Sequence, residues 1–222
     1  MRPDNGFSLI ELAIVLVIVG FLSSSLLGSL QARQRIGDDQ RIAERLQEIV
    51  DSLYGFAATQ GRLPCPAPPQ LASDIAEAGF EDCRLEHGVM PWRTLNLREL
   101  DPWGQRFTYY ARASFTALPT TGALAGFTLD STGNAVVRPS ASAGNKLADS
   151  LPCVVVSHGP NGLGGYRASG QRSPAGDPDE AENADADLSF VDRLPDDSYD
   201  DRLSWPIPSV LKLRLIEAGR LP

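Results

Sequence analysis

Residues 6–20 read GFSLIELAIVLVIVG, an apolar run that contains one charged residue, Glu11. From residue 7 to residue 30, Glu11 is still the only charge. A helix over that segment would be about 36 Å long, which is enough to cross a bilayer. A carboxylate inside such a segment is unfavourable unless it has a partner. Hydropathy alone favours a transmembrane anchor or a secretory signal peptide, and neither explains the glutamate.

The residues on either side of the apolar run do not fit an ordinary signal peptide or anchor. The segment before it holds one basic residue, Arg2, which Asp4 partly offsets, and no convincing A-x-A cleavage sequence follows the run. Arg33 and Arg35 come after the run, which is opposite to the charge bias expected when the C-terminal part is exported. The glutamate therefore calls for a more specific interpretation.

Residues 6–11, GFSLIE, resemble the processing signal shared by type IV pilins and the pseudopilins of type II secretion. The resemblance implies a leader peptide of residues 1–6, cleavage between Gly6 and Phe7, and N-methylation of Phe7. It also implies that Glu11, the fifth residue after the cut, pairs with the N-terminal amine of a neighbouring subunit in a filament. Such pairing would remove most of the penalty of burying the carboxylate. The alternative is a Glu11 side chain that reaches the lipid headgroups without a partner.

An amphipathic pattern continues after the apolar run. Apolar residues recur at spacings of three and four: Ile42, Leu46, Ile49, Leu53 and Phe56. Gly61 and Pro64 end the pattern. We therefore expect one helix from about residue 7 to about residue 60. Its first part, residues 7–30, would span the membrane or fill a filament core, and residues 31–60 would pack on a globular domain of residues 61–222.

The domain of residues 61–222 contains several strand-like segments. Residues 100–110, LDPWGQRFTYY, are similar to the Asp-Pro-Trp-Gly segment of major pseudopilins and predict a turn followed by a strand. Residues 126–139 predict a hairpin, and the apolar residues 152–159 predict a central strand. Ser209 is expected to cap a last helix that ends near Ala218, with Val210, Leu213 and Ile216 packed inward.

The fold class expected from these elements is α+β. The resemblance makes it a pilin-like fold, in which the long N-terminal helix packs on a small antiparallel sheet of three or four strands. A loop-rich C-terminal region and a short terminal helix complete it.

Three cysteines are present, and two of them lie in loop-like sequence. Cys65 and Cys83 are the natural disulfide pair if the domain is exported, whereas Cys153 lies in an apolar run and is expected to be buried. A zinc site is the alternative, because His87 and His158 could join the cysteines as ligands. The sequence contains no C-x-x-C or H-x-x-x-H spacing, which disfavours zinc.

A glycine-rich stretch leads into an acidic segment, in which residues 177–201 contain eleven Asp and Glu and one Arg. The pattern is similar to a loop in which major pseudopilins hold calcium. The resemblance places ligands at Ser157, Asn161, Asn183, Asp185 and Asp187. Calcium favours carboxylate, amide and carbonyl oxygens in a flexible loop. The alternative is a solvated acidic loop and no cofactor at all.

Composition narrows the functional classes. A net charge of -8 argues against nucleic acid as the main partner, because binding nucleic acid needs clustered Lys and Arg. The two histidines lie near no recognisable nucleophile motif, so no enzymatic activity is expected. The resemblance implies a structural subunit of a type IV pilus or a type II secretion pseudopilus. The implied partners are a prepilin peptidase/methyltransferase, other pilin or pseudopilin subunits, an inner-membrane assembly platform and membrane lipid.

The implied location is the bacterial inner membrane, crossed once, with the C-terminal domain in the periplasm until the subunit enters a filament. The alternative function is a membrane-anchored periplasmic module that binds calcium or a partner protein and uses the pilin signal for sorting only. Incorporation into a filament that depends on Glu11 distinguishes the two.

Overall fold

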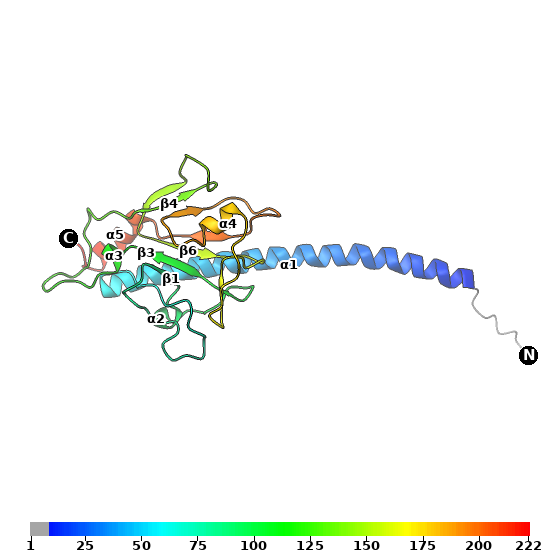
Figure 1. The fold of residues 1–222 in the computed structure, drawn as a ribbon, viewed down its shortest axis with the longest axis horizontal. Helices are drawn as coiled ribbons and strands as arrows, with labels where there is room; N and C mark the ends of the chain where they lie inside the picture. The colour runs from blue at the N-terminus through cyan, green and yellow to red at the C-terminus, as the bar shows by residue number, and fades with distance from the viewer. Residues whose placement is uncertain (1–8) are drawn as a thin grey trace, which may run out of the picture. The chain divides into compact units, whose positions relative to one another are not determined.

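The structure is a computed structural model that describes residues 9–222, apart from the side chains of residues 22–36. It divides into two compact units, Met1–Arg41 and Ile42–Pro222. The helix α1 (Leu9–Gln60) belongs to both units. The remaining elements all lie in the second unit (Figure 1): β1 (His87–Val89), α2 (Trp92–Leu95), β2 (Gln105–Arg106), β3 (Thr108–Ala111), α3 (Ala113–Thr116), β4 (Ala135–Arg138), β5 (Ala148–Leu151), β6 (Cys153–Ser157), β7 (Tyr166–Arg167), α4 (Pro178–Glu182), β8 (Ser189–Val191), β9 (Arg202–Ser204) and α5 (Pro208–Glu217).

The predicted amphipathic stripe forms the core face of α1 in the second unit. Four of its five members are buried, and Phe56 is half-buried because Ala57 takes the next core position. The helix ends where the sequence predicts. Gly61 adopts a left-handed conformation, with φ 69°, and its N–H donates to the carbonyl of Ala57. Arg220 donates to the carbonyls of Ala58 and Thr59, which satisfies two of the acceptors that a helix end leaves free.

The main sheet has four strands in the order β1-β3-β6-β9, and every neighbouring pair is antiparallel. The strand β6 lies between β3 and β9, and all five of its residues are buried. The prediction of an apolar central strand over these residues is confirmed. The order also accounts for the continuous apolar sequence of β6, because a strand covered on both faces needs no alternation.

Side chains from the main sheet alternate between two cores. Tyr109, Cys153 and Val155 pack with the stripe of α1, whereas Tyr110 and Val154 face a second cluster formed with β4, β5 and β8. Figure 1 shows the cyan part of α1 running along β1, β3 and β6. The second unit therefore has three layers: the helix, the main sheet and a small three-stranded sheet. Helices and antiparallel strands together confirm the α+β class.

The predicted hairpin over residues 126–139 is wrong. Only its second half is a strand, β4, and β4 pairs antiparallel with β5 and parallel with β8. The first half packs instead in the core next to α1, where Phe127 contacts Phe115 with ring centroids 4.6 Å apart. The neighbouring Gly126 donates its N–H to the carbonyl of Gly61. Gly61 is 65 residues before Gly126 in the sequence, so the local turn signal could not reveal this contact.

The terminal helix exists, but its expected cap and buried face are wrong. Its N-cap is Ile207, whose N–H donates to the Tyr54 hydroxyl of α1 at 2.8 Å, and Pro208 is at the start of the helix. The buried residues are Leu211 and Leu215. The hydrogen bond from Ile207 to Tyr54 holds the start of α5 against α1, and it joins residues 153 apart in the sequence.

Candidate functional site

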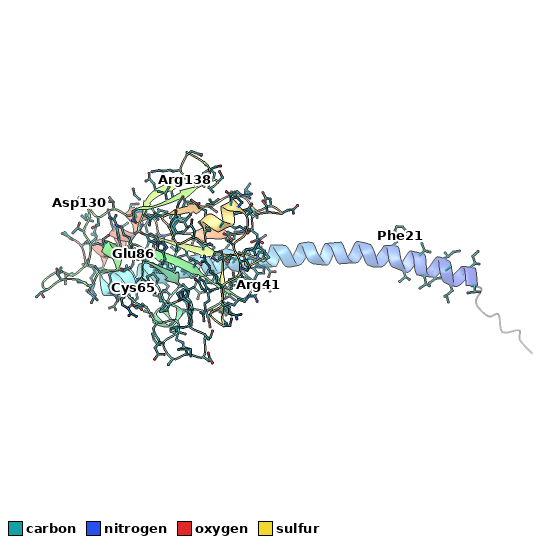
Figure 2. The ribbon with its side chains drawn as sticks, in the orientation of Figure 1. Phe21, Arg41, Cys65, Glu86, Asp130 and Arg138 are labelled. Carbon is teal, nitrogen blue, oxygen red and sulfur yellow. A yellow bond between two sulfur atoms is a disulfide. The ribbon has the colours of Figure 1, made fainter. Side chains whose placement is uncertain are left out.

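The residues that carry the processing signal lie at the beginning of the chain. Gly6 and Phe7 are outside the described residues, whereas Glu11 lies in the first turn of α1 with its side chain exposed. A carboxylate there is favoured by the positive end of the helix dipole. The large apolar side chains between Leu9 and Phe21 are also exposed within this chain. Figure 2 labels Phe21, the last of them.

Within the described part of the chain, no helix combines the length and the apolar character needed to cross a membrane. The expected span, residues 7–30, includes residues outside that description and stays a prediction.

A disulfide joins Cys65 and Cys83, the pair expected from the sequence. Cys65 is labelled in Figure 2, in the loop that follows α1. Arg62 and Glu81 brace this bond, with Arg62 Nη2 2.7 Å from Glu81 Oε1, and the Cys65 N–H donates to Glu81 Oε2 at 2.9 Å. Burial alone would raise the pKa of Glu81, but these hydrogen bonds and the Arg62 charge bring the pKa below its ordinary value.

The third cysteine, Cys153, is buried as expected, and burial raises the pKa of its thiol. The disulfide leaves neither Cys65 nor Cys83 as a thiolate for zinc.

The Asp-Pro-Trp-Gly turn is fastened to the central strand by its aspartate. Asp101 Oδ1 accepts hydrogen bonds from the N–H groups of Trp103 and Gln105, at 3.0 and 2.9 Å. Its other oxygen, Oδ2, accepts from the Ser157 hydroxyl at 2.7 Å. Ser157 ends β6, so the motif connects the start of one strand to the end of another. Burial raises the pKa of Asp101, and the hydrogen bonds partly offset that effect.

The five residues expected to bind calcium fall into two sets. Ser157, Asn161 and Asn183 each donate a side-chain hydrogen bond to an acidic residue outside the expected set: Asp101, Glu180 and Asp201 respectively. Asp185 and Asp187 are exposed and accept from backbone N–H groups two residues ahead, as in Asx turns. Calcium binding by these five residues stays a prediction.

Three other acidic residues lie close together, and Asn161 and Asn183 of the first set donate to two of them. One oxygen each from Glu180, Asp200 and Asp201 lies within 4.8 Å of the others. Glu180 comes from α4, and the two aspartates immediately precede β9. Glu180 and Asp201 are fully buried, whereas Asp200 is partly exposed. We call Glu180, Asp200 and Asp201 the carboxylate group.

The surroundings of the carboxylate group disfavour negative charge. Burial raises the pKa of Asp201 to about 8 and that of Asp200 to about 6, and the neighbouring acids add to both shifts. His158 Nδ1 lies 3.7 Å from Asp201 Oδ1, and its Nε2 is 2.7 Å from the Thr108 hydroxyl. Burial, with the nearby Arg172, lowers the pKa of His158 to about 4, so the imidazole is neutral at pH 7.

Sequence reasoning missed the carboxylate group. The available signal was the acidic segment of residues 177–201, which contains all three residues. The pattern gives no way to choose three acids from eleven, because the choice depends on how α4 and the segment before β9 fold against each other.

Residues 1–27 match the family described as the prokaryotic N-terminal methylation motif. No curated protein and no solved structure matches the chain. The methylation motif is the signal that prepilin peptidase processes, and proteins that carry it are structural subunits that are anchored in the membrane and then assemble with other pilin subunits. The first 27 residues of this chain are therefore the N-terminal signal of type IV pilins and pseudopilins.

Proposed function

We propose that the chain is a structural subunit of a type IV pilus or a type II secretion pseudopilus, with a pilin-like fold. The observation that carries the proposal is the methylation motif of residues 1–27, which leads directly into α1. The same helix then forms one side of the core of an α+β unit. Because the motif precedes the part of α1 that packs in the core, the N-terminal part of the helix can contact other subunits while the C-terminal unit folds by itself.

Glu11 is the residue that we assign to assembly. It is the only charged side chain among the exposed apolar residues 9–21 of α1. In a membrane or a filament core these apolar side chains are covered, and an unpaired carboxylate among them is unfavourable. Cleavage before Phe7 creates an amine about one helical turn from Glu11. Pairing of Glu11 with the amine of a neighbouring subunit neutralises both charges and sets the axial register between subunits.

The partners and location follow from this assignment. The precursor crosses the bacterial inner membrane once, with residues 61–222 in the periplasm. Prepilin peptidase removes residues 1–6 and methylates Phe7, and the inner-membrane assembly platform then moves the subunit from lipid into the filament. The disulfide between Cys65 and Cys83 supports an oxidising location for the domain.

A second candidate function is a membrane-anchored periplasmic binding module that uses the pilin signal for sorting only. The carboxylate group is the observation that favours it, because a buried cluster of acids can hold a cation. Under this function Glu11 would have no role in assembly.

The test replaces Glu11 by alanine in the native host and measures the chain in sheared filaments and in membranes. We expect normal membrane levels and loss of the filament fraction. Glu44→Ala is the matched control, because Glu44 is an exposed carboxylate in the second part of the same helix. Normal incorporation of the Glu11→Ala variant would refute the filament function and leave the binding module.

A further inference from the structure

Residues 194–198, which we call the Leu194 loop, extend into solvent between β8 and β9. All of them are exposed. Leu194 is 88% exposed, more than any other large apolar side chain of residues 42–222. A single exposed leucine is common on protein surfaces and by itself indicates nothing. Leu194 differs from such a residue because a rigid base holds it in this position.

Hydrogen bonds close the base of the Leu194 loop. Asp196 Oδ1 accepts from the N–H groups of Ser198 and Tyr199, at 2.8 and 3.1 Å, and the Asp196 N–H donates to the Tyr199 carbonyl at 2.9 Å. The buried Tyr199 donates its hydroxyl to the Val191 carbonyl at 2.6 Å, and the Arg193 guanidinium lies 4.5 Å from the centroid of the Tyr199 ring. The loop is therefore fixed before any partner arrives, so docking would cost it little conformational entropy.

A second exposed apolar surface lies on α5 and the loop beside it. Leu213 and Ile216 of α5 are 50% and 42% exposed, and Leu129 of the loop is 41% exposed. The Lys212 ammonium donates to the Leu129 carbonyl, and Ile216 lies one helical turn after Lys212 on the same flank of α5. Leu129, Ile216 and Leu213 therefore form one apolar strip with Lys212 at its edge. We call these three apolar residues the distal patch.

The Leu194 loop and the distal patch lie at opposite ends of the second unit. The end of the chain packs beside the last turn of α1, where Arg220 donates to the carbonyls of Ala58 and Thr59. The Leu194 loop precedes Arg202, which pairs with Ser157 at the end of β6. In Figure 1 the orange loop after β8 reaches toward the end of the unit at which its part of α1 begins, and α5 lies at the other end. The two surfaces of one chain therefore cannot meet each other.

The charges around the two surfaces are complementary. Asp196 and Asp197 follow Leu194 in the loop, and both are exposed. Cations outnumber acids around the distal patch, where Lys212, Arg214 and Arg220 face Asp130 and Glu217. Glu217 is already paired with Arg214, with 3.3 Å between Arg214 Nη1 and Glu217 Oε2. A leucine beside carboxylates thus matches an apolar strip beside an ammonium group, and such a match gives a contact its specificity.

We propose that the Leu194 loop of one chain docks on the distal patch of a second copy of the same chain. This inference rests on the proposed filament function, which places copies of the chain along one axis. The contact joins two different surfaces, so it is heterologous and repeats from copy to copy without closing into a dimer. Leu194 excludes water from Leu213 and Ile216, and Asp197 pairs with Lys212, whose ammonium has donors beyond its bond to the Leu129 carbonyl.

The first test is disulfide cross-linking between copies in sheared filaments from the native host. The double variant Leu194→Cys/Leu213→Cys places one new thiol on each surface. The native cysteines do not interfere, because Cys65 and Cys83 are bonded to each other and Cys153 is buried. We expect a ladder of dimers, trimers and longer products after mild oxidation, because each copy can bond to the next. Each single variant should give no ladder.

The matched control for cross-linking is the pair Leu194→Cys/Leu147→Cys. Leu147 is 53% exposed, close to the 50% of Leu213, but it precedes β5 in the small sheet. This pair should give no ladder. The docking is overturned if the Leu213 pair enters filaments without forming a ladder, if the control pair forms an equal ladder, or if the cross-linked partner is a protein of different mass.

The second test exchanges charges and does not depend on cross-linking. Asp197→Lys and Lys212→Glu should each lower the amount of the chain in filaments by about fivefold or more, because like charges then face each other across the contact. The double variant Asp197→Lys/Lys212→Glu should restore the wild-type amount. Lys146→Glu changes another exposed lysine and is the control, which should assemble as the wild type does. The melting temperature of each variant in detergent should match that of the wild type, because neither side chain belongs to a core cluster.

Failure of this inference differs from failure of the filament function. A wild type that is absent from filaments would refute the filament function. A wild type that is present in filaments, together with single charge variants that assemble normally or a double variant that is not restored, would overturn the docking alone.

Discussion

Replacing Asp101 by alanine is expected to destabilise the globular unit more than removal of any exposed acid. Asp101 is 5% exposed and accepts hydrogen bonds from two backbone N–H groups of its turn and from the buried hydroxyl of Ser157. Alanine removes all three acceptors at once. The Ser157 hydroxyl and the Gln105 N–H are both buried, so water cannot easily replace the lost partner.

The magnitude follows from the donors that the substitution leaves unpaired. Each buried donor without an acceptor costs roughly 1–3 kcal/mol, whereas the more exposed Trp103 N–H can turn to water. Release of a buried carboxylate returns part of this cost, so we expect a net loss of about 3 kcal/mol in the free energy of unfolding. Asp101→Asn keeps Oδ1 for the two N–H groups and lets the Ser157 hydroxyl accept from the new amide. Its expected loss is about 1 kcal/mol.

The assay is urea unfolding of the full chain in detergent with EDTA, followed by tryptophan fluorescence, because all three tryptophans lie in the globular unit. Asp130→Ala is the control, since Asp130 is exposed (Figure 2) and its removal should change stability by less than about 0.5 kcal/mol. If Asp101→Ala is no worse than this control, or if Asp101→Asn is as damaging as Asp101→Ala, the reasoning from unpaired donors is refuted.

Three further predictions concern the loop after α1. Replacing Cys65 and Cys83 together by serine should lower the free energy of unfolding by about 3 kcal/mol, because the disulfide closes a loop of 18 residues. A double variant that unfolds at the same urea concentration as the disulfide-bonded wild type would contradict this. The pKa of Glu81 is lower in the folded chain than the value of about 4.3 in an unfolded one, so its contribution is complete above that pH and is lost as the pH falls through the folded pKa. The difference in melting temperature between the wild type and Glu81→Gln should therefore be full at pH 7 and should narrow as the pH falls below the unfolded pKa and through the folded one. A difference that stays the same over that range would exclude the charge effect. Gly61→Ala should cost at least about 1–2 kcal/mol in urea unfolding, because Gly61 has φ 69° and its new Cβ would overlap the carbonyl of Leu124, whereas Gly55→Ala in the exposed helix should be neutral or stabilising.

The parts of the fold that the sequence predicts are those with local signals. The apolar stripe of α1 repeats every three or four residues, and Gly61 marks its end, so the helix could be placed closely. The strand β6 is apolar up to its last residue, Ser157, which indicates a central position before any partner is known. The Asp101 turn likewise forms its first two hydrogen bonds within four residues.

The failures share a cause, which is a contact between residues distant in sequence. The first half of the expected hairpin leaves it because Gly126 donates to the carbonyl of Gly61, which just follows α1 and precedes Gly126 by 65 residues. Tyr54 accepts a hydrogen bond from the N–H at the start of α5, although the two residues are 153 apart in the sequence. The carboxylate group is the same kind of failure, since Glu180 meets Asp200 and Asp201 only because α4 folds against the segment before β9. The sequence shows that residues 177–201 are rich in acidic residues, eleven in all. It does not show which of them come together in the folded chain.

The central claim is that this chain is processed as a pilin-like subunit, and the N-terminus of the mature protein tests it most directly. The measurement is the intact mass and N-terminal sequence of the protein purified from its own membranes. The account predicts a chain that begins at Phe7 and is one methyl group heavier than the unmodified polypeptide of residues 7–222. A chain that still begins at Met1, or one cut after the apolar run near Ala32, would contradict it.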